Sequence, residues 1–521
     1  MPHRTYAPAR GQNASSLRRP GTHTRSRTSR HFFIEGVHVS TRSPARLRDA
    51  GIALAGLSAV FLFEMLDNSV LNVALPTIGR ELHASTTGLQ WVTGAYSVVF
   101  GALMLLFGAV ADRFGRRRVM LVGLVLLALS ALATTLVTTT GELIAVRALM
   151  GIAAAMTTPG SMALAFRLFD TDALRVRALT VISTAGLVGL AVGPTAGGFA
   201  LAVAPWQALL LVNVPIAALA FIGIRAGVPA DRPEDLHPDR IDVTGALFGT
   251  TALVGALGTP TLFAEAGSAS WPGWTGVVVT VAAVAAFVQR ERTAAQPLLD
   301  LRLLARPLVA SGLAYKAASG LAVSGLSYLV TLQLQFAWGW SPALAAIGTL
   351  PQVVVLLASG RFVGPFVQRV GLGRAAWLSA GAVVAGLALF TVGGRAGYGW
   401  VAAALVLVAA GMRVVGVVAG NNVLQGLPSN RTSVGAALVD TSSELATAVG
   451  IAATGTVLAL LVPGSIASTS WTADRLTAFE DGITVAGVVL TVVAALLVAV
   501  GMARATTRAG TPVAEPAQTA L

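Results

Sequence analysis

Long apolar runs separated by short polar segments fill the chain from residue 50 to residue 503. A helix needs about 20 predominantly apolar residues to cross a bilayer, and runs of about that length recur throughout this region. The runs cover residues 50–75, 88–110, 119–138, 142–166, 178–203, 206–227, 241–263, 273–290, 308–334, 343–366, 374–394, 399–426, 433–462 and 482–503. The pattern predicts an all-α polytopic membrane protein with 14 transmembrane helices.

The polar segments between these runs divide the chain into parts. Residues 1–49 are rich in Arg, Ser, Thr and Pro and hold no long apolar run, so we expect a disordered tail. The other expected parts are a six-helix half (50–227), a linker (228–240), a helix pair (241–290), a loop (291–307), a second six-helix half (308–503) and a tail (504–521).

Basic residues fall in alternate polar segments. If the N-terminus lies inside, only Arg80, Arg395 and Arg475 fall in external loops. Because Arg and Lys remain preferentially on the cytoplasmic side, we expect both termini to be cytoplasmic and the protein to lie in the cytoplasmic (inner) cell membrane.

Composition narrows the possible functions. The chain is 55% hydrophobic and 11% charged, with a mean hydropathy of +0.74, which is typical of polytopic membrane proteins. Most of the basic residues behind the net charge of +13 lie in alternate loops, where membrane orientation accounts for them. We therefore expect no nucleic-acid partner. The sequence has no Cys, no phosphate-binding loop and no His in metal-ligand spacing. We therefore expect no metal, no cofactor, no ATP-driven pumping and no enzyme.

The polar segment with the most distinctive sequence is GAVADRFGRRR, at residues 108–118, between the second and third apolar runs. Its spacing of Gly108, Asp112, Arg113, Gly115 and Arg116 resembles the signature loop of the major facilitator superfamily. That family's fold consists of two related six-helix halves. We expect Asp112 to hold neighbouring helix ends through charge-assisted hydrogen bonds.

A weaker copy of this loop, GPFVQRVGLGR, lies at residues 364–374 and follows the tenth run. A twelve-span member would have the second loop after its eighth helix, so two additional helices lie between the halves here. This arrangement resembles the 14-span drug:proton antiporter branch. The fifth run supports this likeness, because it carries a glycine and proline pattern similar to the antiporter motif of the superfamily. The residues of that pattern are Gly189, Gly193, Pro194, Gly197 and Gly198.

Charged residues inside the first and fourth runs are the first candidates for chemistry, because intramembrane charge is costly and rarely incidental. Asp67, in LDNSVLNVALP, resembles the first-span motif of the branch, and Arg147 resembles the buried arginine assigned to proton transfer in the superfamily. At 1.5 Å per residue they lie about 12 and 7 Å below the outer boundary, so they could pair. A purely structural ion pair is the alternative. Glu64 shares the face of Asp67, and its role is open.

The thirteenth run places Asp440 and Glu444 four residues apart on one helix face, where they would hinder each other's ionisation. This stretch resembles a span of the branch in which acidic residues are implicated in recognising cationic drugs. Arg413, in the twelfth run, could neutralise Glu444, which would leave Asp440 as the better site residue. For Lys316 we expect a side chain that extends to the cytoplasmic headgroups.

The resemblance implies proton-coupled efflux of lipophilic compounds, cationic drugs or antibiotics among them, by alternating access. The expected partners are these substrates, protons and the bilayer, with the proton gradient in place of a cofactor and a monomer as the functional unit. Two alternatives stay open: a proton-coupled or facilitative carrier of a specific small solute or metabolite, and a membrane enzyme acting on lipid.

Overall fold

A computed structural model describes residues 46–169, 171–232, 236, 241–267, 269–294, 297–427, 432–462, 465–466 and 472–506. Most of the two predicted tails lies outside these residues. The described residues form helices joined by short connections, and no strand occurs among them.

The helices of the first half are α1 (Gly51–Glu81), α2 (Thr86–Phe114), α3 (Arg116–Ala133), α4 (Thr140–Leu168), α5 (Asp172–Ala200), α6 (Gln207–Leu211) and α7 (Asn213–Gly227). They are followed by α8 (Val243–Ala266) and α9 (Trp271–Thr293). The remaining helices are α10 (Leu301–Leu304), α11 (Pro307–Leu332), α12 (Pro342–Gly348), α13 (Leu350–Ala358), α14 (Gly360–Val370), α15 (Leu372–Gly393), α16 (Tyr398–Gly426), α17 (Thr432–Leu461) and α18 (Ala473–Thr506).

Among the described residues, 13 helical segments are long and apolar enough to cross a membrane, and the bent pair α13–α14 brings the total to 14. The predicted all-helical membrane fold is thus confirmed. The single helix predicted at 343–366 is wrong, because this segment consists of α12, α13 and α14, with a 63° bend between the last two. Pro351 near the start of α13 has no backbone N–H to continue the preceding helix.

Short polar side chains define where several helices begin. Ser85 accepts a hydrogen bond from the Gly88 amide (2.9 Å) at the start of α2, and Thr139 forms a capping box with Glu142 at the start of α4. Gly115 separates α2 from α3 with φ +106°, a conformation that L side chains rarely adopt. These caps explain why the apolar runs divide into antiparallel helices.

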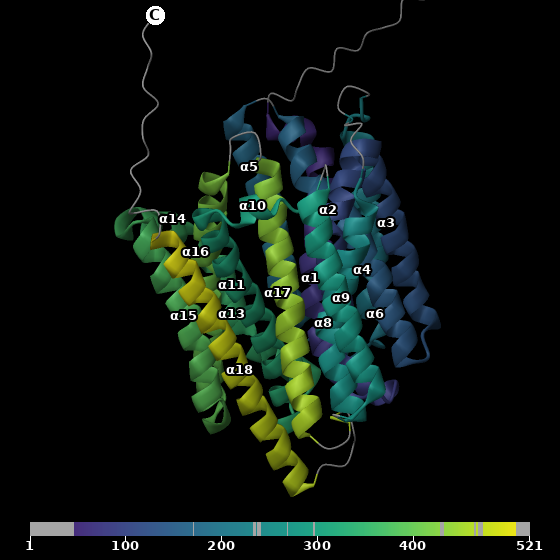
Figure 1. Ribbon diagram of the computed structural model, residues 1–521, viewed down its shortest axis with the longest axis vertical. Coiled ribbons are helices and arrows are strands. Elements are labelled where there is room, and N and C mark those ends of the chain that lie inside the picture. The colour runs from purple at the N-terminus through teal and green to yellow at the C-terminus, as the bar shows by residue number, and fades with distance from the viewer. Residues whose placement is uncertain are drawn as a thin grey trace, which may run out of the picture. The chain divides into compact units, whose positions relative to one another are not determined.

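Helix packing brings distant parts of the sequence together. Helix α1 packs along α5 and α7, α2 along α4, and α11 along α16, α17 and α18. The two halves meet where α2 packs against α17 and where α5 packs against α12 and α13. Helix α8 packs against its neighbour α9 and also against α2 and α17, beside this junction (Figure 1).

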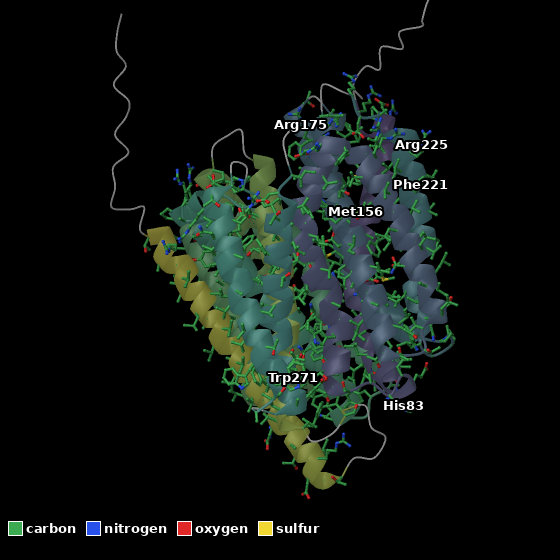
Figure 2. The ribbon with its side chains drawn as sticks, turned by 45° about the vertical axis from the view of Figure 1, so that its right-hand side comes forward. His83, Met156, Arg175, Phe221, Arg225 and Trp271 are labelled. Atoms are coloured by element: carbon green, nitrogen blue, oxygen red, sulfur yellow. The ribbon has the colours of Figure 1, made fainter. Side chains whose placement is uncertain are left out.

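The two ends of the helices differ in character. Arg175 and Arg225 lie at one end, with the Gly115 turn, and His83 and Trp271 lie at the other (Figure 2). We call these the Gly115 end and the His83 end. The predicted cytoplasmic loops are at the Gly115 end.

Candidate functional site

A buried ion pair joins α1 to α4. Arg147 Nη1 donates a hydrogen bond to Asp67 Oδ2, and the two side chains are 1% and 0% exposed. Arg147 Nε also donates to the Val92 carbonyl (3.2 Å), and the guanidinium lies 4.6 Å from the ring centroid of Tyr96. Asp67 and Arg147 therefore form an ion pair, as their estimated depths in the membrane suggested they could.

The other carboxylate oxygen of Asp67 also has a donor. Asn213, the first residue of α7, donates from Nδ2 to Asp67 Oδ1 (2.8 Å) and is itself fully buried. The break at Val212 between α6 and α7 places this side chain at the ion pair. The sequence analysis did not single out Asn213, although a polar amide inside an apolar run was the available signal.

Glu64 lies one helical turn from Asp67 and has a separate partner. Thr158 on α4 donates to Glu64 Oε2 (2.8 Å), and Glu64 is buried. Its carboxylate is within electrostatic reach of Glu444, Asp440 and Lys316. Carboxylates from both halves thus approach each other in the interior.

The two acidic residues of α17 have different surroundings. Glu444 is buried and lines the central cavity; its Oε2 makes no hydrogen bond among the described residues, and the Ser97 hydroxyl of α2 interacts with the carboxylate. It packs against α2, because a Cβ added at Gly101 would lie 3.3 Å from Glu444 Cβ. Asp440 is half-buried and is not among the residues that line the cavity.

Two of the sequence interpretations of basic residues need correction. Arg413 forms no ion pair with Glu444 in the described part of the chain, and its Nη2 would lie 2.9 Å from a Cβ added at Gly360. The bent α13–α14 pair brings Gly360 to this position. Lys316, which we expected to extend to the headgroups, has a side chain that lines the central cavity, because α11 turns this face towards α17.

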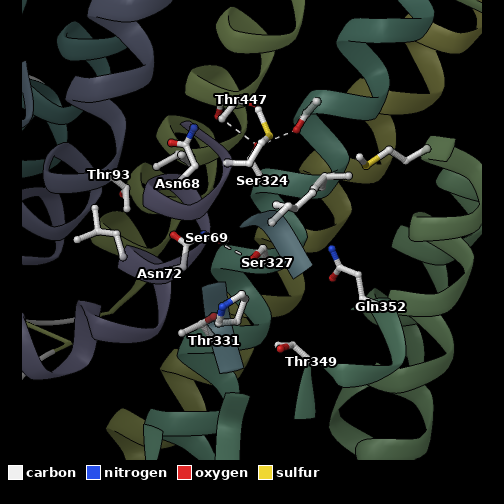
Figure 3. A pocket seen from close by; sticks show the side chains of 18 of the residues that line it. Asn68, Ser69, Asn72, Thr93, Ser324, Ser327, Thr331, Thr349, Gln352 and Thr447 are labelled. Carbon is white, nitrogen blue, oxygen red and sulfur yellow. Dashed lines mark hydrogen bonds between the residues drawn. The ribbon is translucent and has the colours of Figure 1, made fainter. Parts of the chain in front are cut away.

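The cavity lies between the halves and has a volume of about 180 Å³. Its residues come mainly from α1, α11, α13 and α17. Hydroxyl and amide side chains face one another across it in Figure 3: Asn68, Ser69, Asn72, Thr93, Ser324, Ser327, Thr331, Thr349, Gln352 and Thr447. Leu, Val, Ile and Met side chains supply most of the apolar lining, the charged residues Arg147, Lys316 and Glu444 are part of it, and no aromatic residue is part of it among the described residues. The cavity therefore suits an amphiphilic molecule.

Glycines on one face of α5 allow close packing against α1. Gly189 lies against the backbone of Leu62, Gly193 against Ser69 and Gly197 against Val70. Pro194 lines the cavity. On the other side, a Cβ added at Gly198 would lie 2.6 Å from the Pro342 carbonyl of α12, so this glycine lets the two halves touch.

The loop between α2 and α3 is held by two aspartates. Arg116 Nε donates to Asp112 Oδ1 (2.7 Å), a pair formed within the loop and partly exposed. The neighbouring Arg113 lies over the ring of Phe114, and Gly108 has open space around it.

Asp231, in the predicted linker, connects this loop to other helices. It accepts hydrogen bonds from the amides of Arg117 (3.3 Å) and Arg118 (3.2 Å) and lies 3.7 Å from Arg167 of α4. The pair of Asp112 on α2 and Arg116 on α3 is the expected charge-assisted bond between helix ends, and Asp231 adds a further connection from the start of α3 to α4.

Comparison with known proteins places the chain among transporters. Residues 57–451 match the family described as Major Facilitator Superfamily. The multidrug efflux pump LfrA of Mycolicibacterium smegmatis is 29% identical over 433 residues, covering 81% of this chain and 83% of that protein. The cephamycin export protein CmcT of Amycolatopsis lactamdurans is 30% identical over 437 residues, covering 82% and 88%.

Solved structures agree with the fold. A bacterial homologue of the human lysosomal transporter Spinster, in an inward-facing and unoccupied conformation, superposes with a TM-score of 0.61 at 15% identity. The match covers 88% of this chain and 97% of that one.

Proposed function

Because the chain belongs to the major facilitator superfamily, we propose that it exports lipophilic compounds across the cytoplasmic membrane in exchange for protons. As a family member the chain is a multi-pass membrane transporter and not an enzyme. Its relatives include proteins named for multidrug efflux, cephamycin export and puromycin resistance, which supports efflux at the level of the family.

Proton coupling would occur at Asp67. Its ionised form is stabilised by Arg147 and Asn213, one donor for each oxygen, in a site closed to solvent. Protonation would weaken both interactions. Arg147 also lines the central cavity, so a substrate there would be next to the proton site. This adjacency is the observation that best supports coupling of the two ligands.

Movement of the halves would carry both ligands across the membrane. At the His83 end, Gln335 donates to the Val73 carbonyl (3.0 Å), and the Ile466 amide donates to Thr86 Oγ1 (3.2 Å). Both bonds join the first half to the second. Alternating access would require these contacts at the His83 end to break and re-form as the cavity is exposed to each side of the membrane in turn.

The proposal includes a topology with both termini in the cytoplasm and a monomeric working unit that uses no cofactor. The basic residues at the Gly115 end support this orientation (Figure 2).

A carrier of one specific solute is the second candidate, because the hydroxyl and amide groups of the cavity could fix a small polar molecule. Uptake into energised inverted membrane vesicles separates the two functions. Efflux with proton exchange predicts uncoupler-sensitive accumulation of several unrelated amphiphiles. Accumulation of none of a broad panel would contradict the export proposal, and accumulation of a single solute class would favour the specific carrier.

A further inference from the structure

The central cavity carries one cation and one anion that the buried ion pair does not use. Arg147 is engaged by Asp67, which leaves Lys316 and Glu444 as the other charged residues in the lining. Lys316 is half-buried and Glu444 is 7% exposed. Both are supplied by the second half, from α11 and α17, which pack against each other.

These two residues do not neutralise each other by contact. Their charges are within electrostatic reach of each other and of Asp440 and Glu64, two carboxylates that do not line the cavity. No ion pair or hydrogen bond joins Lys316 to any side chain in the described part of the chain. Glu444 Oε2 is buried and makes no hydrogen bond there, and the Ser97 hydroxyl is the one uncharged side-chain group beside the carboxylate that interacts with it. A buried carboxylate oxygen without a donor is costly, and the half-buried Lys316 has no ion-pair partner, so a ligand that satisfies both groups would gain stabilisation that the protein alone does not provide.

The remaining lining limits what that ligand can be. Hydroxyl and amide groups alternate with aliphatic side chains, and no aromatic ring is available in the lining to hold a cation by its face. A lipophilic monocation would find Glu444 but would be repelled by Lys316. A monoanion would be repelled by Glu444. A molecule that carries both charges meets neither penalty.

We propose that the cavity binds zwitterionic amphiphiles, with the ammonium group of the substrate at Glu444 and its acidic group at Lys316. This inference rests on the proposed export function and narrows its substrate class. Lys316 selects the acidic group, Glu444 selects the amine, and the aliphatic and hydroxyl lining accommodates the rest of the molecule.

Three matched probes test the assignment. Nε-dansyl-lysine is a fluorescent zwitterion, its methyl ester is a cation, and its Nα-acetyl derivative is an anion. In proteoliposomes with a proton gradient, the wild-type protein should transport the zwitterion at least about tenfold faster than either derivative; a factor of ten corresponds to about 1.4 kcal/mol. Faster transport of the ester would leave proton-driven export intact and overturn the zwitterion assignment.

Substitutions then assign each charge. Lys316→Met should reverse the preference towards the ester, Lys316→Arg should retain the preference for the zwitterion, and Glu444→Gln should move it towards the acetyl derivative. Arg413→Met is the matched control, because Arg413 is also an intramembrane cation but does not line the cavity; the preference should not change. If Lys316→Met slows all three probes by the same factor, Lys316 is an internal counter-ion of the carboxylates and the proposal is wrong.

A binding measurement gives an answer even if no probe is transported. Lys316 is the only lysine of the chain, so acetylation of its amine in purified protein can be followed by mass spectrometry. The zwitterion should protect Lys316 at concentrations at which the ester does not. Equal protection by both, or by neither, would contradict the assignment independently of the export function.

Discussion

Removing one partner of the buried ion pair should destabilise the protein far more than removing both. Arg147→Met would leave the carboxylate of Asp67, which is 0% exposed, with Asn213 as its remaining donor. Truncating one side of a buried pair costs about 3–5 kcal/mol, whereas replacing both charges is often nearly neutral. Arg147→Met combined with Asp67→Asn should therefore recover most of the loss, with a coupling energy above about 2 kcal/mol.

The assay is reversible unfolding of the four purified proteins in detergent, which gives the free energies of a double-mutant cycle. The exposed Asp112–Arg116 pair is the control; its side chains are 39% and 25% exposed, so its coupling should be about 0–1 kcal/mol. Additive effects at Asp67 and Arg147 would refute the reasoning.

Three further outcomes follow from individual contacts. Asp231→Ala should lower stability by about 0.5–2 kcal/mol, because two amides at the start of α3 lose their acceptor; unchanged thermal unfolding would contradict this. At Asp242, before α8, burial opposes ionisation, but hydrogen bonds from Arg290 and the Gly245 amide outweigh it and hold the pKa below its ordinary value. The stabilisation is therefore complete at neutral pH and lost as pH falls through that lowered pKa, so the melting temperatures of wild type and Asp242→Asn should converge only in acid. Gly198→Leu should push α5 away from α12 and slow transport. Because the chain has no Cys, two engineered cysteines carrying spin labels can report the distance between these helix ends. An unchanged distance would contradict the steric argument.

The hydrophobic pattern was sufficient to predict the class of fold and nearly all of the spans, because a helix in a bilayer must satisfy its own backbone hydrogen bonds over a fixed length. The same rule does not predict where a span breaks. Thr349 and Ser359 interrupt the predicted tenth span, and the neighbouring helices decide the direction of the 63° bend.

The free-energy cost of placing charge in a membrane was enough to identify the charged candidate residues from the sequence. It does not predict which of these residues face one another. Asp67 and Arg147 stood out because charge inside an apolar run is expensive. Asn213 is uncharged, and Asp231 lies in a polar linker, so neither carried that signal. Lys316 was misplaced because its distance along the helix axis was considered, whereas its rotation towards the cavity depends on how α11 packs against α17.

Substrate-induced proton release tests the central proposal most directly, namely that Asp67 carries the coupling proton. Purified wild-type protein in weakly buffered detergent solution should release protons when a transported substrate is added, over a limited pH range. Asp67→Asn should still bind the substrate, measured by fluorescence, but release no protons, because an amide cannot ionise. An undiminished proton signal from this variant would contradict the account and move the coupling role to Asp440, Glu444 or Glu64.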